Sequence, residues 1–253
     1  MARVTLRFYE ELNTFLPADR RKRSYSLDVL ANPSVKDVIE SQGVPHTEVD
    51  LVLVNGESVD FAHQVRDGDR ISVYPVFEGL DISRASLVRP EPLRHTRFIL
   101  DVHLGKLARL LRLFGFDTLY RDDYEDAEIV DIAEEERRII LTRDQGLLMR
   151  RRVTHGYWLR SQDPLTQAAE VLARFDLTEQ TRPFSRCPRC NGVLEEVPAE
   201  EVADRVPPES RRHYDRFYQC RLCGQVYWQG SHYAGIVASL RDIRKHAEKL
   251  RKP

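Results

Sequence analysis

Short apolar runs alternate with helical patterns in the middle of the chain. The runs at 98–100 and 139–141 are continuous and apolar, as is typical of strands buried in a parallel sheet. Between them, apolar residues recur at helical spacing from Leu104 to Phe114, and Gly115 ends that helix. In chain order we expect a strand at 98–100, a helix at 104–114, a strand at 118–120, a helix that buries Ile129, Ile132 and Ala133, and a strand at 138–142. This alternation predicts crossover connections and a parallel α/β sheet.

Acidic residues follow the predicted strands. The candidates are Asp101, Asp122, Asp123, Asp126 and Asp144. Ligands of such sheets bind beyond the carboxyl ends of the strands, so we expect carboxylates there to gather at one edge and to bind Mg²⁺ or Mn²⁺. Asp is also a favoured helix N-cap, and capping alone would explain any single one of these residues. The repetition of acids at corresponding strand ends favours the metal site.

Residues 1–80 show the alternation of apolar and polar residues that is typical of strands with one buried face. We expect strands around Leu6, Leu27, Leu53 and Val73, a helix capped by Ser34, and a hairpin turn at Asn55-Gly56. This part of the chain is therefore predicted to be an α+β domain of its own.

Three further boundaries follow from composition. Residues 81–97 contain Pro90 and Pro92 and have no clear period, which indicates a linker. The α/β domain is expected at 98–182 and closes with a helix that opens at Asp163-Pro164. One apolar face of this helix is expected to carry Leu165, Ala168, Ala169, Leu172 and Phe175. A helix over 146–152 would end in three arginines, which suit either phosphates or the negative end of that helix.

The remaining segment, 183–253, contains all four cysteines in two C-x2-C pairs. Cys187 with Cys190 and Cys220 with Cys223 offer four thiolates that could surround Zn²⁺ tetrahedrally. Two redox-active pairs are the alternative, but neither pair lies in a thioredoxin-like βαβ context. We therefore expect a closed structural zinc ribbon that folds this segment, followed by a basic C-terminal helix.

The composition fits a multidomain protein with a soluble exterior. The 253 residues are 42% hydrophobic and 31% charged, enough for two or three cores. No apolar run approaches the roughly 20 residues of a membrane span, and no signal-peptide core precedes the first strand pattern. We expect a cytoplasmic protein without membrane contact.

The net charge of −1 conceals an uneven distribution. Residues 121–136 include nine acids and one Arg, whereas residues 205–253 include eleven Lys or Arg and four acids. Such an arrangement suits a metal-dependent enzyme that acts on a polyanion, although charged runs are also ordinary solvated faces. Basic and aromatic residues interleave around the second cysteine pair, which favours single-stranded nucleic acid over a small aromatic core. The candidate substrate-binding residues are Lys106, Arg109, Arg143, Arg212, Arg216 and Trp228.

Residues 1–80 resemble the β-grasp, ubiquitin-like domain of small sulfur-carrier proteins, through Val54-Asn55-Gly56, Asp67-Gly68-Asp69 and a last strand that ends in Pro75. Those carriers end in a free Gly-Gly, whereas residues 77–80 contain one Gly and the chain continues. Sulfur transfer is thus disfavoured, and a docking role toward a protein partner is expected.

The whole chain resembles the PIN-like RNase family known as the Mut-seven C-terminal family, in its form with an N-terminal ubiquitin-like domain. The resemblance is carried by residues 98–120, the ILTRD element that ends at Asp144, SRCPRCNG at 185–192, and CRLCGQVYWQGSH at 220–232. It implies a PIN-like nuclease domain in which Asp101 and Asp144 bind Mg²⁺ or Mn²⁺. Asp126 matches the acid that opens the middle helix, and Glu128 and Asp131 compete with Asp122 and Asp123 for the middle position.

We therefore expect a metal-dependent ribonuclease whose zinc ribbon assists RNA binding. The alternative is a non-catalytic RNA-binding adaptor with a ubiquitin-like domain that docks a partner. In both cases the expected fold class is multidomain α/β and α+β: a β-grasp domain, a PIN-like parallel α/β domain and a four-Cys zinc ribbon.

Overall fold

The computed structural model describes residues 1–30, 32–75, 86–88, 93 and 95–250. Its internal contacts divide the chain into two units, Met1–Arg94 with Asp126–Trp158, and His95–Glu125 with Leu159–Pro253. Each unit contains part of the α/β region expected at 98–182. In the described part of the chain, no helix is both long and apolar enough to cross a membrane.

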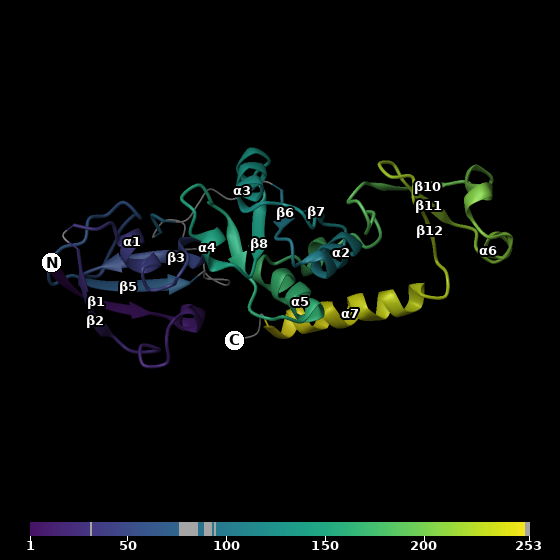
Figure 1. Cartoon of the computed structure of the whole chain (residues 1–253). Coiled ribbons are helices and arrows are strands. Elements are labelled where there is room, and N and C mark those ends of the chain that lie inside the picture. Colours follow the sequence, from purple (N-terminus) through teal and green to yellow (C-terminus); the bar gives the residue numbers. More distant parts are fainter. Residues whose placement is uncertain (31, 76–85, 89–92, 94, 251–253) are drawn as a thin grey trace. The chain divides into compact units, whose positions relative to one another are not determined.

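The N-terminal domain is a five-stranded sheet of order β2-β1-β5-β3-β4 (Figure 1). Its strands are β1 (Ala2–Phe8), β2 (Tyr25–Val29), β3 (Val49–Val54), β4 (Glu57–Ser58) and β5 (Arg70–Pro75). The first and last strands pair in parallel, and the other pairs are antiparallel. The predicted β-grasp architecture is therefore confirmed.

Local sequence explains this sheet. Leu6 and its apolar neighbours on β1 are buried, whereas the intervening polar residues are not, because successive side chains of a strand point to opposite faces. Helix α1 (Val35–Glu40) covers the buried face, and Ser34 and Asp37 form a capping box at its start. The Asn55-Gly56 turn has φ values of 55° and 92°, as the tight hairpin between β3 and β4 requires.

The expected linker at 81–97 is described in part. Residues 81–85, 89–92 and 94, with Pro90 and Pro92, lie outside the described residues, and so does the single-Gly segment at 77–80. Ser86 donates a hydrogen bond to the carbonyl of Asp50, and Val88 is buried in the core of the N-terminal domain. At these positions the chain packs against the domain that it follows.

The N-terminal domain also contacts strand β9 (Gly156–Trp158), which belongs to the same unit. The 3-10 helix η2 (His46–Glu48) supplies the contacts: Glu48 accepts from the backbone N–H of Trp158 at 2.7 Å, and Nε2 of His46 lies 2.8 Å from the carbonyl of Val153. Nδ1 of His46 lies 2.6 Å from the carboxylate of Glu40. Both ring nitrogens of His46 thus lie within hydrogen-bonding distance of an oxygen.

The central strands form a four-stranded sheet of order β7-β6-β8-β9. The strands are β6 (Arg97–Leu100), β7 (Asp117–Leu119), β8 (Ile139–Thr142) and β9, and the helices are α2 (Gly105–Leu113), α3 (Asp126–Glu135), α4 (Gln145–Leu148) and α5 (Pro164–Arg174). Pairs β6–β7 and β8–β9 are parallel. This confirms the parallel α/β prediction.

The helices follow the predicted apolar spacing with two corrections. Leu104, Leu107 and Phe114 are buried on one face of α2, as expected. The helix expected over 146–152 ends at Leu148, so the three arginines lie beyond it. Leu165, expected on the apolar face of α5, is 49% exposed because it lies in the first turn, before the buried face begins.

The C-terminal segment is a three-stranded antiparallel sheet followed by a long helix. Strands β10 (Leu194–Val197), β11 (Phe217–Cys220) and β12 (Val226–Trp228) pair in that order, and the connection from β10 to β11 holds η4 (Ala199–Arg205) and α6 (Pro208–His213). Helix α7 (Tyr233–Leu250) packs along α5 and buries Leu240, Ile243 and Ala247 (Figure 1). The remaining 3-10 helices are η1 (Glu10–Phe15) and η3 (Thr178–Gln180).

Candidate functional site

Asp101 lies immediately after β6, where the sequence placed it. Its Oδ1 accepts from the N–H of Val102 at 2.6 Å, and the hydroxyl of Tyr120 donates to the carbonyl of Val102 at 2.7 Å. Tyr120 packs so closely on the start of α2 that a Cβ at Gly105 would lie 2.8 Å from its hydroxyl oxygen. Burial raises the pKa of Tyr120, and the carboxylates of Asp122 and Asp101 contribute to the increase. Both carboxylates therefore lie close enough to the phenol of Tyr120 to raise its pKa.

Asp122 and Asp123 differ in their surroundings. Asp123 uses both oxygens to accept from Arg121, at 2.8 Å each. These hydrogen bonds lower the pKa of Asp123. Since a carboxylate with both oxygens engaged is a weaker metal ligand, Asp122 is the stronger candidate of the two.

Asp126 and Asp144 occupy the helix starts that the sequence predicted. Asp126 opens α3, and its Oδ2 accepts from Arg150 at 2.8 Å. Asp144 is the N-cap of α4, where its Oδ1 accepts from the N–H of Gly146 at 2.8 Å. The capping interaction therefore exists, and it engages one of the two carboxylate oxygens.

Two of the three arginines after α4 form ion pairs with acids of α3. Arg150 pairs with Asp126, and Arg152 pairs with Asp131 and Glu134. Both arginines thus neutralise part of the acidic helix α3. This result could have been anticipated, because residues 121–136 carry nine acids and need nearby cations.

The predicted phosphate-binding residues lie on separate elements. Lys106 and Arg109 are exposed on α2, and the side chain of Arg109 has no ion-pair partner among the described residues. Arg143 directly follows β8, and its carbonyl accepts from the indole N–H of Trp158 at 3.0 Å. Arg212 is exposed on α6, and Arg216 lies 3.9 Å from Glu196.

The four cysteines come together as predicted. In the described part of the chain, the four cysteines form a cluster of potential metal ligands whose sulfur atoms all lie within 4.8 Å of one another. The Sγ atoms of Cys187 and Cys223 are 3.8 Å apart, and those of Cys190 and Cys220 are 3.4 Å apart. Tetrahedral zinc with bonds of about 2.3 Å places its sulfurs about 3.8 Å apart, so the cluster could hold this ion.

Two further features fit a cation at the cysteines. A Cβ at Gly192 would lie 2.7 Å from the sulfur of Cys220, so the knuckle tolerates glycine alone at this position. Burial, together with the thiols of Cys223 and Cys220, raises the pKa of Cys190 to about 12. Four thiolates cannot share this space at neutral pH unless a cation offsets their charge.

The first cysteine knuckle is fastened to the α/β region by residues that sequence reasoning missed. Arg112, 5% exposed, donates to the carbonyls of Thr118, Arg189 and Pro188 at 2.9, 3.0 and 3.3 Å. Asn191 accepts from the N–H of Thr118 and donates to Asp117, which also pairs with Arg186. The signal for Arg112 was present, because it lies four residues after the buried Ala108 and therefore on the same face of α2.

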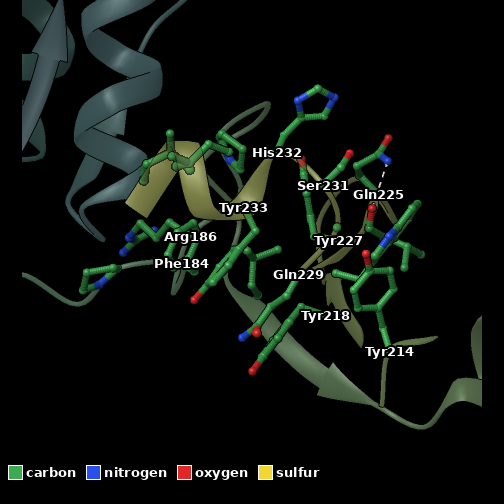
Figure 2. A pocket seen from close by; sticks show the side chains of 18 of the residues that line it. Phe184, Arg186, Tyr214, Tyr218, Gln225, Tyr227, Gln229, Ser231, His232 and Tyr233 are labelled. Atoms are coloured by element: carbon green, nitrogen blue, oxygen red, sulfur yellow. Dashed lines mark hydrogen bonds between the residues drawn. The ribbon is translucent and has the colours of Figure 1, made fainter. Parts of the chain in front are cut away.

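The aromatic residues near the cysteines divide into two groups. Phe217 is fully buried and belongs to a small core with Val202, Val206 and Val226, so for this residue the core interpretation is correct. The others remain partly exposed around a cavity of about 630 Å³. They are Phe184, Tyr214, Tyr218, Tyr227, Trp228 and Tyr233 (Figure 2).

The comparisons with known proteins identify the domains. The Mut7-C RNAse domain model matches residues 96–240, more than half of the chain. The chain belongs to the Mut7-C RNAse domain family. A model of the Mut7-C ubiquitin domain matches residues 1–81. No curated protein matches the chain. The crystal structure of SAMP1 from Haloferax volcanii is similar at 18% identity and a TM-score of 0.25, covering 31% of this chain and all of that one.

The two matches confirm the predicted family and its N-terminal ubiquitin-like domain. The Mut7-C RNAse match spans Asp101, Asp126, Asp144 and all four cysteines. The acids and the cysteine cluster are thus parts of one family domain.

Proposed function

We propose that this Mut7-C protein is a metal-dependent ribonuclease that hydrolyses RNA phosphodiesters. The observation that carries the proposal is the RNAse-domain match over 96–240. The location of acids immediately after parallel strands supports it, because ligands of α/β sheets bind at such ends. The substrate class follows from the family, and the basic C-terminal segment fits a polyanion.

Asp101 and Asp144 are the proposed ligands of Mg²⁺ or Mn²⁺, because carboxylate oxygens are the donors that these hard cations prefer. Capping and metal binding are compatible at Asp144, since its cap engages Oδ1 and a carboxylate offers two oxygens. Asp126 or Asp122 completes the set; Asp126 would have to share its carboxylate with Arg150. When bound, the cation supplies a polarised water and offsets charge on the phosphate.

Lys106, Arg109 and Arg143 are proposed to steady the phosphates of the substrate. They are cations on α2 and directly after β8, the elements next to Asp101 and Asp144. Phosphate contacts position a nucleic acid without reading its sequence. We therefore propose that contacts other than these three cations select which RNA is bound.

Zn²⁺ is proposed to be the resident ion of the four cysteines, with a structural role. Four protein ligands fill a tetrahedral site and leave no open position for a substrate. Because a zinc site of four thiolates requires reduced cysteines, we also propose a reducing, cytoplasmic location. The ribbon is proposed to assist RNA binding through Arg212, Arg216 and Trp228.

The decisive experiment is RNA cleavage with Mn²⁺ or Mg²⁺ by the wild type and by Asp101→Asn and Asp144→Asn. Both substitutions remove a charge and preserve size, and Asn remains a good N-cap at position 144. We expect cleavage to fall at least 100-fold in each, because a direct metal ligand is lost, while zinc content and thermal stability remain unchanged. Wild-type cleavage rates in both variants would rule out these acids as the metal site.

A non-catalytic RNA-binding adaptor is the second candidate. The pairing of Asp123 with Arg121, of Asp126 with Arg150 and the capping by Asp144 favour it, since structural roles would account for these acids. The adaptor hypothesis predicts salt-sensitive RNA binding by the wild type without turnover in either metal. In either case we propose that the ubiquitin-like domain docks a protein partner, and a pull-down with this domain deleted would test that role.

A further inference from the structure

Several separate parts of the chain line the cavity beside the zinc ribbon. Helix α2 contributes Arg109 and Leu113, strands β11 and β12 contribute Tyr218 and Trp228, and the start of α7 contributes Tyr233. All of these parts belong to the same unit. A volume of about 630 Å³ lies within the usual range of ligand-binding cavities, roughly 300–1,000 Å³.

The walls of the cavity are aromatic surfaces that the fold leaves partly exposed. Figure 2 shows Phe184 beside Tyr233, with ring centroids 5.0 Å apart, and Tyr218 and Tyr214 at the same cavity. The small core of the ribbon buries Phe217 completely, whereas Tyr218 and Tyr233 remain partly exposed. Flat rings that remain accessible offer stacking surfaces to a flat ligand.

The polar groups at the cavity specify the ligand further. Arg109 lines it with a guanidinium that has no ion-pair partner in the described part of the chain, and this cation suits a phosphate. The amide of Gln229 is exposed at the cavity and can donate to and accept from the edge of a base. The aromatic rings suit the face of a base, the amide suits the edge of the base, and the guanidinium suits the phosphate of a nucleotide.

We propose that this cavity binds an unpaired base of single-stranded RNA, which stacks on Tyr218 and Tyr233 while Arg109 contacts an adjacent phosphate. The inference rests on the proposed action on RNA and specifies its substrate as single-stranded. Paired bases are excluded, because their faces are covered by neighbouring bases within the duplex. An RNA strand bound in the cavity would therefore contact both helix α2 and the zinc ribbon.

The zinc site supports the walls of this cavity. The hydroxyl of Tyr227 lies 3.1 Å from the sulfur of Cys187, and Tyr218 lies two residues before Cys220 on β11. Loss of the ribbon fold would therefore disperse the stacking surfaces. A zinc-depleted protein is expected to lose binding of single strands.

The test is binding of a fluorescein-labelled oligoadenylate of about ten nucleotides to the full-length protein that carries Asp101→Asn, so that hydrolysis does not interfere. Tyr218→Leu removes one stacking ring, and Tyr218→Phe keeps it. We expect Tyr218→Leu to weaken binding by about 5-fold to 100-fold and Tyr218→Phe to bind like the parent. Double-stranded RNA of the same length should bind weakly to all three proteins.

Arg109→Gln tests the phosphate contact, with Arg23→Gln on the ubiquitin-like domain as the matched loss of charge. We expect Arg109→Gln to reduce the slope of log affinity against log salt by about 0.7, and Arg23→Gln to leave it unchanged. Zinc content and circular dichroism identify a misfolded variant. If Tyr218→Leu misfolds, quenching of Trp228 emission by the unlabelled oligomer, measured in Trp158→Phe, replaces it.

The outcomes separate this inference from the proposed hydrolysis. Equal binding by folded Tyr218→Leu, or no Trp228 quenching in the replacement assay, overturns the cavity proposal even if the wild type cleaves RNA. If binding depends on Tyr218 but the wild type cleaves no RNA, the cavity proposal is supported and the proposed hydrolysis is ruled out. Preference for duplex RNA also overturns the proposal.

Discussion

The buried guanidinium of Arg112 gives the sharpest prediction about the zinc ribbon. It binds β7 through the carbonyl of Thr118 and joins α2 to the first cysteine knuckle through the carbonyls of Arg189 and Pro188. Burial lowers the pKa of Arg112, and the nearby thiols of Cys190 and Cys187 act in the opposite direction. In the zinc-bound form, four thiolates and one divalent ion leave a net negative charge that this cation would offset.

Arg112→Met is the appropriate perturbation, because Met keeps the apolar stem and the helix propensity and removes the guanidinium alone. The two hydrogen bonds to the knuckle measure 3.0 and 3.3 Å. A bond from a charged donor contributes about 1.5–3 kcal/mol, and the lower value suits a donor whose own burial is unfavourable. Two such bonds give about 3 kcal/mol, equivalent to a roughly 100-fold shift toward the open knuckle.

The assay is the rate at which zinc passes to an excess of a colorimetric chelator. If opening precedes release, Arg112→Met should release zinc up to about 100-fold faster than the wild type. Arg109→Met is the matched control, because Arg109 lies on the same helix, is exposed and has no ion-pair partner among the described residues. Equal release rates for Arg112→Met and the wild type would refute the argument that this guanidinium holds the knuckle.

Two further predictions concern other contacts. Asn191→Ala leaves the buried N–H of Thr118 without its acceptor and puts Ala at a φ of 71°, so the free energy of unfolding should fall by about 2–3 kcal/mol in urea. Asn191→Gly also lacks the acceptor but adopts the positive φ without strain, so it should lose less. Burial raises the pKa of Tyr25 to about 12, and Arg20 opposes the increase. The neutral phenol is therefore favoured in the folded state, so its contribution to stability is complete below about pH 10 and is lost as the pH rises to about 12. Tyr25→Phe should remove this part of the alkaline destabilisation, and identical pH profiles for the two proteins would contradict it.

Sequence periodicity predicted the elements well where local signals agree. The alternation on β1, the capping box at Ser34 and the apolar face of α2 depend on neighbouring residues, and such signals can be read from the chain itself. The helix after Asp144 was predicted too long, because arginine is a good helix former and nothing local signals its ion pairs with α3. Gly115 shows both kinds of information. Its helix-ending role was predicted, but the overlap of a Cβ there with the carbonyl oxygen of Arg182, a residue distant in sequence, was not.

The sequence by itself determined the domain types, the acids at strand ends and the two pairs of cysteines, because strand period, helix caps and C-x2-C spacing are local properties of the chain. Tertiary structure alone decided which charges neutralise one another, as Arg150 does with Asp126. It also decided that Arg112 and Asn191 fasten the knuckle, and that Tyr218 and Tyr233 share a cavity while Phe217 is buried. These outcomes depend on residues up to about 80 positions apart, since burial and pairing are set by the packing of whole elements.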